Sequence, residues 1–212
     1  MVEAAAIVIG YLFGSIPTAY IAGRLRRGVD IRKIGGSNMG ALNVAREIGR
    51  GEGAVVFMID AAKGAGAILV ARYLGLSQLW VLLAGFASVV GHNWPIFLNF
   101  RGGKGAATTI GIFLTLVPRE FACCLPIMGI VIGLTSNVTL GVATGLVFLP
   151  LFLWLFSQSL SIIIYAIVTV LFLGLRYLPT AKRSLERAAS ARDFVIDRNY
   201  KPWQTRKNKP LR

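Results

Sequence analysis

The sequence predicts an all-α membrane protein with seven transmembrane helices, an external N-terminus and a cytoplasmic C-terminus. Its 212 residues are 55% hydrophobic and only 15% charged, and the mean hydropathy is +0.66. Soluble domains are about 45–50% apolar and about 25% charged. Seven apolar runs and a one-sided distribution of basic residues then define the spans and their orientation.

The apolar runs follow one another with few polar interruptions. A membrane helix needs roughly 20 apolar residues, and fewer where the bilayer is locally thin. The run 106–135 counts as two short spans, which tilt, thin the bilayer or are partly re-entrant, because Pro118, Arg119 and Glu120 interrupt it. The predicted spans are 3–23, 53–74, 77–98, 106–117, 121–135, 139–156 and 159–176.

The basic residues determine the orientation. Lys and Arg total 23 against 9 acidic residues, a formal charge of +14. Seven lie in 24–52, two in 99–105 and eleven from Arg176 onward. Positively charged loops stay in the cytoplasm, so both loops and the tail are predicted there. The charge therefore indicates attraction to anionic lipid and not a nucleic-acid footprint.

Two regions follow from this layout. Residues 1–176 are predicted to form the membrane domain, and 177–212 a basic cytoplasmic tail. Residues 182–198 of the tail could form an amphipathic surface helix, and the alternative is a solvated tail near anionic lipid. No cleavable signal peptide is expected, because the chain opens with Glu3 and the first apolar run is long.

Small and sulfur-containing residues in the apolar runs are interpreted as packing groups. G-x-x-x-G spacing lets membrane helices approach closely. It occurs at Gly10–Gly14, Gly129–Gly133 and Gly141–Gly145. Cys123 and Cys124 are adjacent, lie in an apolar run and have no ligand-like spacing, so neither a zinc site nor a disulfide scaffold is expected.

The loop 35–46 combines glycines with Ser37, Asn38, Asn43 and Arg46. Glycines let backbone N–H groups approach an anion, and arginine offers a rigid fork that suits phosphate. The loop is therefore a candidate anion site. A glycine-rich turn without a ligand is the alternative.

The loop before the fourth span is richer in such features. Gly102, Gly103, Lys104 and Gly105 run directly into an apolar helix, whose first N–H groups and positive dipole end suit a phosphate. A nucleotide-binding P-loop needs Gly-Lys followed by Ser or Thr, whereas Gly105 and then Ala106 follow Lys104 here, so a nucleotide site is disfavoured.

Three further side chains have both a structural and a functional interpretation. His92 is the single histidine and precedes this loop. It either bonds a nearby carbonyl or contacts the substrate. Asp60 and Lys63 lie within the second span at i, i+3, where buried charges usually face the protein interior. They either pair structurally or help to hold the phosphate-binding loops.

These motifs carry a resemblance to a known family. The chain resembles the bacterial integral-membrane acyl-phosphate:glycerol-3-phosphate acyltransferases over nearly its whole length. The strongest match reads Gly91-His92-x-Trp94-Pro95-x-Phe97-x-x-Phe100-x-Gly102-Gly103-Lys104-Gly105-x-Ala107-Thr108. The motif Asp60-x-x-Lys63-Gly64 matches the family as well.

The resemblance implies a reaction and its participants. A fatty acyl chain passes from acyl phosphate to the 1-hydroxyl of glycerol 3-phosphate, which gives lysophosphatidic acid for phospholipid synthesis. No cofactor, no metal, no nucleic acid and no particular oligomer are implied. Membrane lipids are the other partners, and the expected location is the bacterial inner membrane with the active site facing the cytoplasm.

The resemblance also assigns roles to residues. Activated acyl phosphate requires orientation and charge stabilisation more than a covalent nucleophile. The expected catalytic residues are Lys104, Arg46, Asn38 and His92. The expected substrate-binding residues are Ser37, Asn43, Gly102, Gly103, Gly105, Thr108, Thr139 and Lys63.

The chain departs from the family pattern at several positions. In the first motif the serine is displaced to Ser37 and a threonine is replaced by Leu42. Thr139 stands where a serine is usual, and Tyr177 and Thr180 replace a His and an Asn. These departures leave two alternatives, a different phosphorylated polyol as acceptor and a non-catalytic lipid- or acyl-phosphate-binding paralogue. A small-anion transporter is disfavoured, because transporter sites usually lie near the midplane.

Overall fold

The computed structural model describes residues 1–187, 195 and 196. All the secondary-structure elements of these described residues are helices, which confirms the all-α prediction. The α-helices are α1 Val2–Ser15, α2 Thr18–Arg27, α3 Ala41–Glu47, α4 Arg50–Tyr73, α5 Gln78–Asn93, α6 Ala106–Leu116, α7 Pro118–Thr135, α8 Val138–Leu155 and α9 Leu160–Arg187, with short 3-10 helices η1 Ile31–Lys33 and η2 Ile96–Leu98.

Six helical segments of the described chain are long and apolar enough to cross a membrane. They are Val2–Arg27, Arg50–Tyr73, Gln78–Leu98, Pro118–Thr135, Val138–Leu155 and Leu160–Glu186. The remaining predicted span corresponds to α6, a shorter apolar helix of 11 residues. The expected break between the two short spans is present: α6 ends at Leu116, and α7 begins with Pro118 at its first position.

The first predicted span differs from a single helix. Residues 3–23 form two helices, α1 and α2, separated at Ile16 and Pro17. A proline has no N–H, and its ring clashes with the preceding turn, so the helix cannot continue unchanged through Pro17. Hydropathy does not reveal this break, because the residues on both sides of it are apolar.

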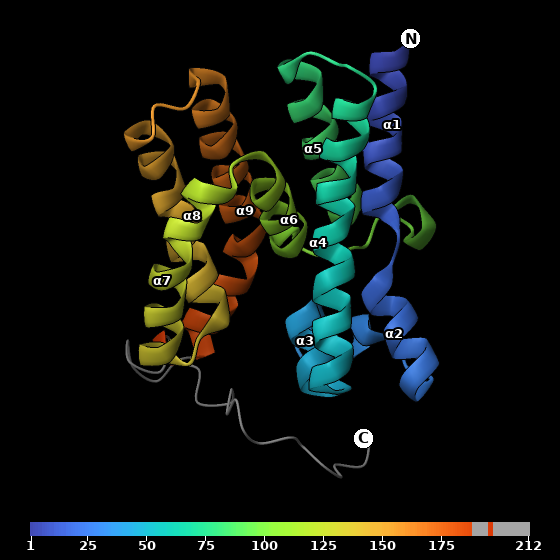
Figure 1. Ribbon diagram of the computed structural model, residues 1–212. Helices are drawn as coiled ribbons and strands as arrows, with labels where there is room; N and C mark the ends of the chain where they lie inside the picture. Colours follow the sequence, from blue (N-terminus) through green and yellow to red (C-terminus); the bar gives the residue numbers. More distant parts are fainter. Residues whose placement is uncertain (188–194, 197–212) are drawn as a thin grey trace. The chain divides into compact units, whose positions relative to one another are not determined.

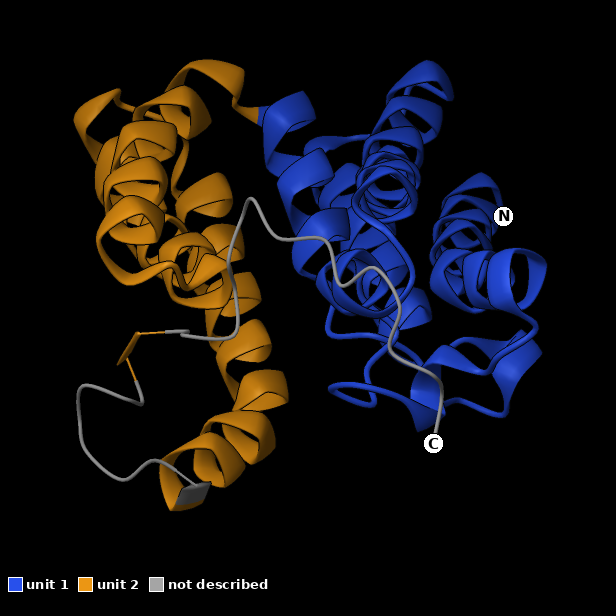
Figure 2. Ribbon diagram, turned by 90° about the horizontal axis from the view of Figure 1, so that it is seen from below, with its two compact units in different colours: residues 1–116, 204–212 blue, residues 117–203 orange. Residues whose placement is uncertain are grey.

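The chain divides into two compact units, residues 1–116 and the described residues from Val117 onward (Figure 2). In the first unit, α4 forms a continuous rod of 24 residues. Helices α1, α3, α5 and α6 pack against it. Figure 1 shows α1 beside one half of α4, with α2 and α3 beside the other half.

Glycines set the closest helix contacts of the first unit. A Cβ on Gly10 or Gly14 of α1 would overlap the carbonyl oxygen of Ala84 or Ser88 on α5. A Cβ on Gly64 of α4 would likewise meet the carbonyl of Thr108 on α6. The predicted packing role of Gly10–Gly14 is therefore confirmed, because any side chain at these positions would push the two helices apart.

In the second unit, α8 packs against α7 and α9. Gly141 and Gly145 of α8 lie against Ile132 and Met128 of α7, which confirms the second glycine pair as packing residues. Near the start of α7, the buried Glu120 accepts a hydrogen bond of 2.7 Å from the Gln158 amide. This bond ties α7 to the connection between α8 and α9.

The packing role predicted for Gly129 and Gly133 is not seen in the described residues, and the predicted tail helix falls mostly outside them. A Cβ on Gly129 or Gly133 would meet no atom of the described residues within 4 Å, so these glycines make no close helix contact there. Helix α9 continues to Arg187, and most of the predicted tail helix 182–198 lies outside the described residues. The division between a membrane domain and a tail at residue 177 stays a prediction.

The same substitution should have opposite effects at two of these glycines. Gly14→Ala should lower the free energy of unfolding by about 1–3 kcal/mol, because the new methyl group overlaps the Ser88 carbonyl. Gly129→Ala should be neutral or stabilise by up to about 1 kcal/mol through helix propensity. Thermal unfolding of both purified variants in detergent measures the difference, and equal stabilities would contradict the packing assignment.

Candidate active site

The candidate site begins at the break between α1 and α2. Ile16 and Pro17 cross beside Asp60 and Lys63, which lie near the middle of α4. Asp60 is ten residues beyond Arg50, or about 15 Å along a helix that rises about 1.5 Å per residue. The polar groups are thus recessed well inside the apolar body of the protein.

Asp60 and Lys63 form a buried ion pair with partners on both sides of the break. Their exposed fractions are 1% and 4%. The Lys63 ammonium donates to Asp60 Oδ1, to Thr18 Oγ1 and to the backbone carbonyl of Ile16, each at 2.5 Å. The Thr18 hydroxyl also donates to Asp60 Oδ1. An ammonium has three donors, so Lys63 is fully occupied within the protein.

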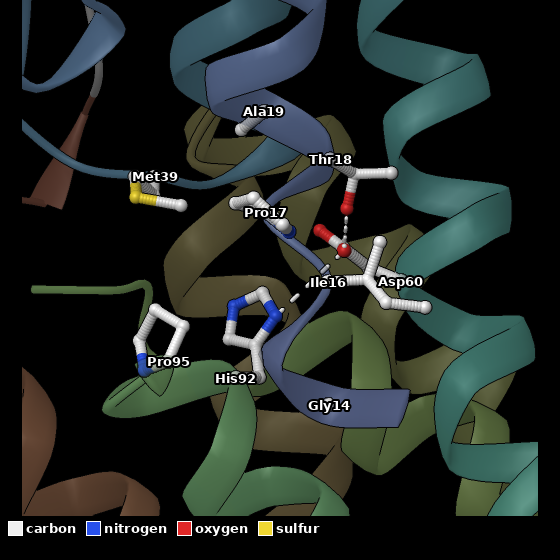
Figure 3. Close-up of a pocket in the computed structure, with 9 residues that line it drawn as sticks. All are labelled: Gly14, Ile16, Pro17, Thr18, Ala19, Met39, Asp60, His92 and Pro95. Atoms are coloured by element: carbon white, nitrogen blue, oxygen red, sulfur yellow. Dashed lines mark hydrogen bonds and ion pairs between the residues drawn. The ribbon is translucent and has the colours of Figure 1, made fainter. Parts of the chain in front are cut away.

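His92 approaches this pair from the last turn of α5. Its Nδ1 lies 3.7 Å from Asp60 Oδ1, close enough for an ion pair when the ring is protonated but longer than a hydrogen bond. Figure 3 shows the imidazole and the Thr18 hydroxyl both directed at the Asp60 carboxylate. Three separate elements therefore converge on one carboxylate.

The glycine-rich loop packs onto the end of α5. The Gly102 and Gly103 N–H groups donate to the carbonyls of Asn93 and His92, at 3.2 Å and 3.0 Å. A Cβ on Gly103 would overlap His92 Nε2, and one on Gly102 would overlap the His92 carbonyl. These two glycines therefore serve close packing, and their N–H groups are already bonded to protein carbonyls.

Lys104 and Gly105 lead from this loop into α6. Lys104 is partly exposed, and Gly105 takes a positive φ of 85° immediately before the helix. The N–H groups of the first helical turn have no acceptor within the helix and carry its positive dipole end. Thr108, in this turn, is fully buried, and its carbonyl lies against Gly64.

The first predicted loop is organised around Asn43. Its amide nitrogen donates to the carbonyls of Ile31, Ile34 and Asn38 at 3.0–3.2 Å, and its oxygen accepts from Gly36 N–H at 2.9 Å. The side chain is 6% exposed. Asn43 therefore holds the loop in shape.

The other polar residues of this loop lie nearer its surface. Ser37 is exposed and has a positive φ of 51°, Asn38 is half-buried, and Arg46 is exposed in the last turn of α3. These three polar side chains of the first motif are thus less buried than Asn43.

The two motif loops meet beside His92. A Cβ on Gly103 would lie 2.8 Å from the carbonyl oxygen of Met39, which is the residue after Asn38. A second contact joins the Arg32 guanidinium to the Leu98 carbonyl at 3.5 Å. Arg32 also forms a bidentate pair with Asp30, at 2.8 Å and 3.0 Å, which lowers the pKa of the Asp30 carboxyl.

A small pocket lies at this junction and has no room for a water-sized sphere. The pocket is lined by Gly14, Ile16, Pro17, Thr18, Ala19, Met39, Asp60, His92 and Pro95 (Figure 3). The described residues contain no group of three or more His, Cys, Asp or Glu that could hold a metal ion.

The structure unites most of the predicted site residues in the first unit. Lys63, His92, Gly102 and Gly103 lie at the junction, and the remaining first-unit residues lie on the two loops or the start of α6. Thr139 lies in the second unit, in the first turn of α8. Sequence reasoning missed Thr18 and the Ile16 carbonyl, although Pro17 within an apolar run was a signal for a break.

A helical membrane protein with cationic, glycine-rich loops at the ends of broken helices is suited to a phosphorylated ligand. Residues 4–187 match the sequence model described as Glycerol-3-phosphate acyltransferase. The chain belongs to this family.

Individual relatives agree with this assignment. The chain is 39% identical to "Glycerol-3-phosphate acyltransferase 1" of Dehalococcoides mccartyi over 92% of this chain and 97% of the relative. Two crystal structures of PlsY (YgiH), an integral membrane glycerol 3-phosphate acyltransferase, are similar, in its glycerol 3-phosphate form and its lysophosphatidic acid form. Their TM-scores are 0.82 and 0.80 and their identities 30% and 29%, over 88% of this chain and 94% and 93% of theirs.

Replacement of the loop organiser should destabilise the first motif. Asn43→Ala removes four hydrogen bonds, among them the buried bond to the Ile31 carbonyl, so the free energy of unfolding should fall by about 2–4 kcal/mol. Ser37→Ala, at an exposed position in the same loop, should change it by less than about 0.5 kcal/mol. Chemical unfolding in detergent compares them. A stable Asn43→Ala protein with a raised KM would instead favour direct substrate contact.

Proposed function

We propose that this protein transfers a fatty acyl group from acyl phosphate to the 1-hydroxyl of glycerol 3-phosphate. The observation that carries the proposal is the junction of two glycine-rich, cationic loops at Met39 and Gly103, directly before α6. Family membership and the product form of PlsY support the same reaction. The product is lysophosphatidic acid.

The reaction needs orientation and charge stabilisation. The acceptor oxygen attacks the acyl carbonyl carbon, the bond between that carbon and the phosphate oxygen breaks, and the net proton leaves on hydrogen phosphate. Lys104 and the first turn of α6 suit one phosphate, and Arg46 suits another as a rigid fork. Ser37 and Asn38 add neutral hydrogen-bonding groups beside them. Gly105 and Thr108 shape the start of α6 for this phosphate.

Three other predicted ligands are better placed to support the site than to touch substrate. The donors of Lys63 and the amide of Asn43 are occupied by protein groups. His92 lies against Gly103, which favours the structural interpretation of this side chain. Thr139, in the first turn of α8, is kept as a proposed substrate-binding hydroxyl.

We also propose that α6 is the seventh span. Its 11 residues extend about 17 Å, against about 30 Å for the hydrocarbon layer. However, α6 starts beside Gly64 near the middle of α4, and its Thr115 carbonyl accepts a hydrogen bond from Arg72 at the end of α4. It therefore has only the remaining part of the layer to cross. Seven spans place the basic loops and the site on the cytoplasmic face.

Removal of the loop cation should impair the reaction. Lys104→Ala should lower kcat/KM by about 10²–10³-fold, which is the usual effect of losing one group that stabilises developing charge. Lys33→Ala, which removes an exposed lysine of η1, should leave it unchanged. The assay measures lysophosphatidic acid from acyl phosphate with glycerol 3-phosphate and with other phosphorylated polyols. Unaltered turnover in Lys104→Ala would contradict the proposal, and a clearly better polyol would revise the acceptor.

Cysteine accessibility distinguishes seven spans from six. In a background with Cys123→Ala and Cys124→Ala, a cysteine at Ser159 should react with a membrane-impermeant maleimide in intact cells, because seven spans put the α8–α9 connection outside. A cysteine at Lys33 should react only after permeabilisation. Protection of position 159 in intact cells would show that α6 does not cross.

A further inference from the structure

We propose that Asp60 and Lys63 are positioning residues for acyl transfer, which act through His92 on the backbone at Gly103 and so place Lys104. This inference rests on the proposed function. It differs from a substrate-binding role for Lys63, because neither charged group needs to touch the substrate.

The Asp60–Lys63 pair is anchored at the break between α1 and α2. Lys63 bonds the Ile16 carbonyl at the break, and both Lys63 and the Thr18 hydroxyl bond the same Asp60 oxygen. The Asp60–Lys63 pair is therefore held by both sides of the break, through Ile16 and Thr18. Since the surroundings are buried and apolar, a carboxylate or ammonium that moved away from these partners would be strongly destabilised.

His92 links this fixed carboxylate to the glycine-rich loop. Asp60 Oδ1 faces His92 Nδ1 at 3.7 Å, and the opposite ring nitrogen, Nε2, faces Gly103. The loop cannot shift toward the ring, because there is no space for even a methyl group between them. The Gly103 N–H also donates to the His92 carbonyl. A movement of the imidazole would therefore displace the residue that precedes Lys104.

The Asp60–Lys63 pair provides a fixed geometry more than stability. A buried ion pair often adds little to stability compared with apolar residues of similar volume. The pair does fix the orientation of its two side chains, because their hydrogen bonds are satisfied in one arrangement only. A small displacement of a group that orients reacting atoms costs far more in rate than in folding free energy.

The experiment removes both charges together, since a single substitution would leave an unpaired buried charge. Asp60→Asn/Lys63→Met keeps similar volumes. We expect a folded protein whose kcat for lysophosphatidic acid formation falls between about tenfold and 100-fold, as for other supporting residues. The KM values for both substrates should change by less than the kcat does, because no substrate contact is lost.

The single histidine gives a direct readout of position. In protein labelled with ¹⁵N-imidazole histidine and purified with a histidine-free tag, His92 contributes the one pair of ring-nitrogen resonances. We expect both resonances to shift in the double variant. The matched control is Glu120→Gln, which removes a buried carboxylate bonded to Gln158 in the second unit, and it should leave the His92 resonances and kcat unchanged.

Two outcomes would overturn the inference. Wild-type kcat with unshifted His92 resonances would show that the pair does not act through His92. A raised KM for either substrate at unchanged kcat would show direct substrate contact. Failure of the proposed function is distinguishable, because it appears as absent acyl transfer in the wild-type protein, while the resonance shift tests the coupling separately.

Discussion

The carbonyl of Ile16 lies where the first long helix is interrupted inside an apolar body. Backbone polar groups in such surroundings must find partners within the protein, because no water replaces them. Thr18 N–H and the Lys63 ammonium both donate to this carbonyl. Lys63 in turn requires Asp60, because an unpaired ammonium would be too costly to bury. The break, the ion pair and the approach of His92 are therefore one connected arrangement.

The same arrangement explains why helices of such different length share one unit. Among the described helices of the first unit, only α4, with 24 residues or about 36 Å, is long enough to pass the whole hydrocarbon layer as one unbroken helix. Helices α1 and α5 end near its midpoint, and α6 begins there. Their ends provide the polar N–H and carbonyl groups from which a site can be built. The candidate site is thus recessed because α1, α5 and α6 each have one end beside the middle of α4.

Hydropathy and charge were sufficient to predict the helical class, the two motif loops and the break before Pro118, because each changes the local composition. The separation of α1 from α2 could not be predicted in this way, since Ile16 and Pro17 are as apolar as their neighbours. Asp60 and Lys63 were recognisable as a pair from their spacing, but Thr18 is distant in sequence. Gly102 and Gly103 illustrate the same limit: their pattern suggested N–H groups for phosphate, whereas tertiary packing directs those groups to Asn93 and His92.

The two lysines of the site region consequently have different surroundings. Lys63 is buried, neutralised by Asp60 and saturated with acceptors, so it can fix geometry but has no donor left for a ligand. Lys104 is partly exposed and follows a glycine that is held against His92. A cation that binds a phosphate has to be accessible, whereas a cation that positions the phosphate-binding group has to be immobile. In the first unit the immobile lysine lies on α4 and the accessible one in the loop before α6, so the two properties are carried by different residues.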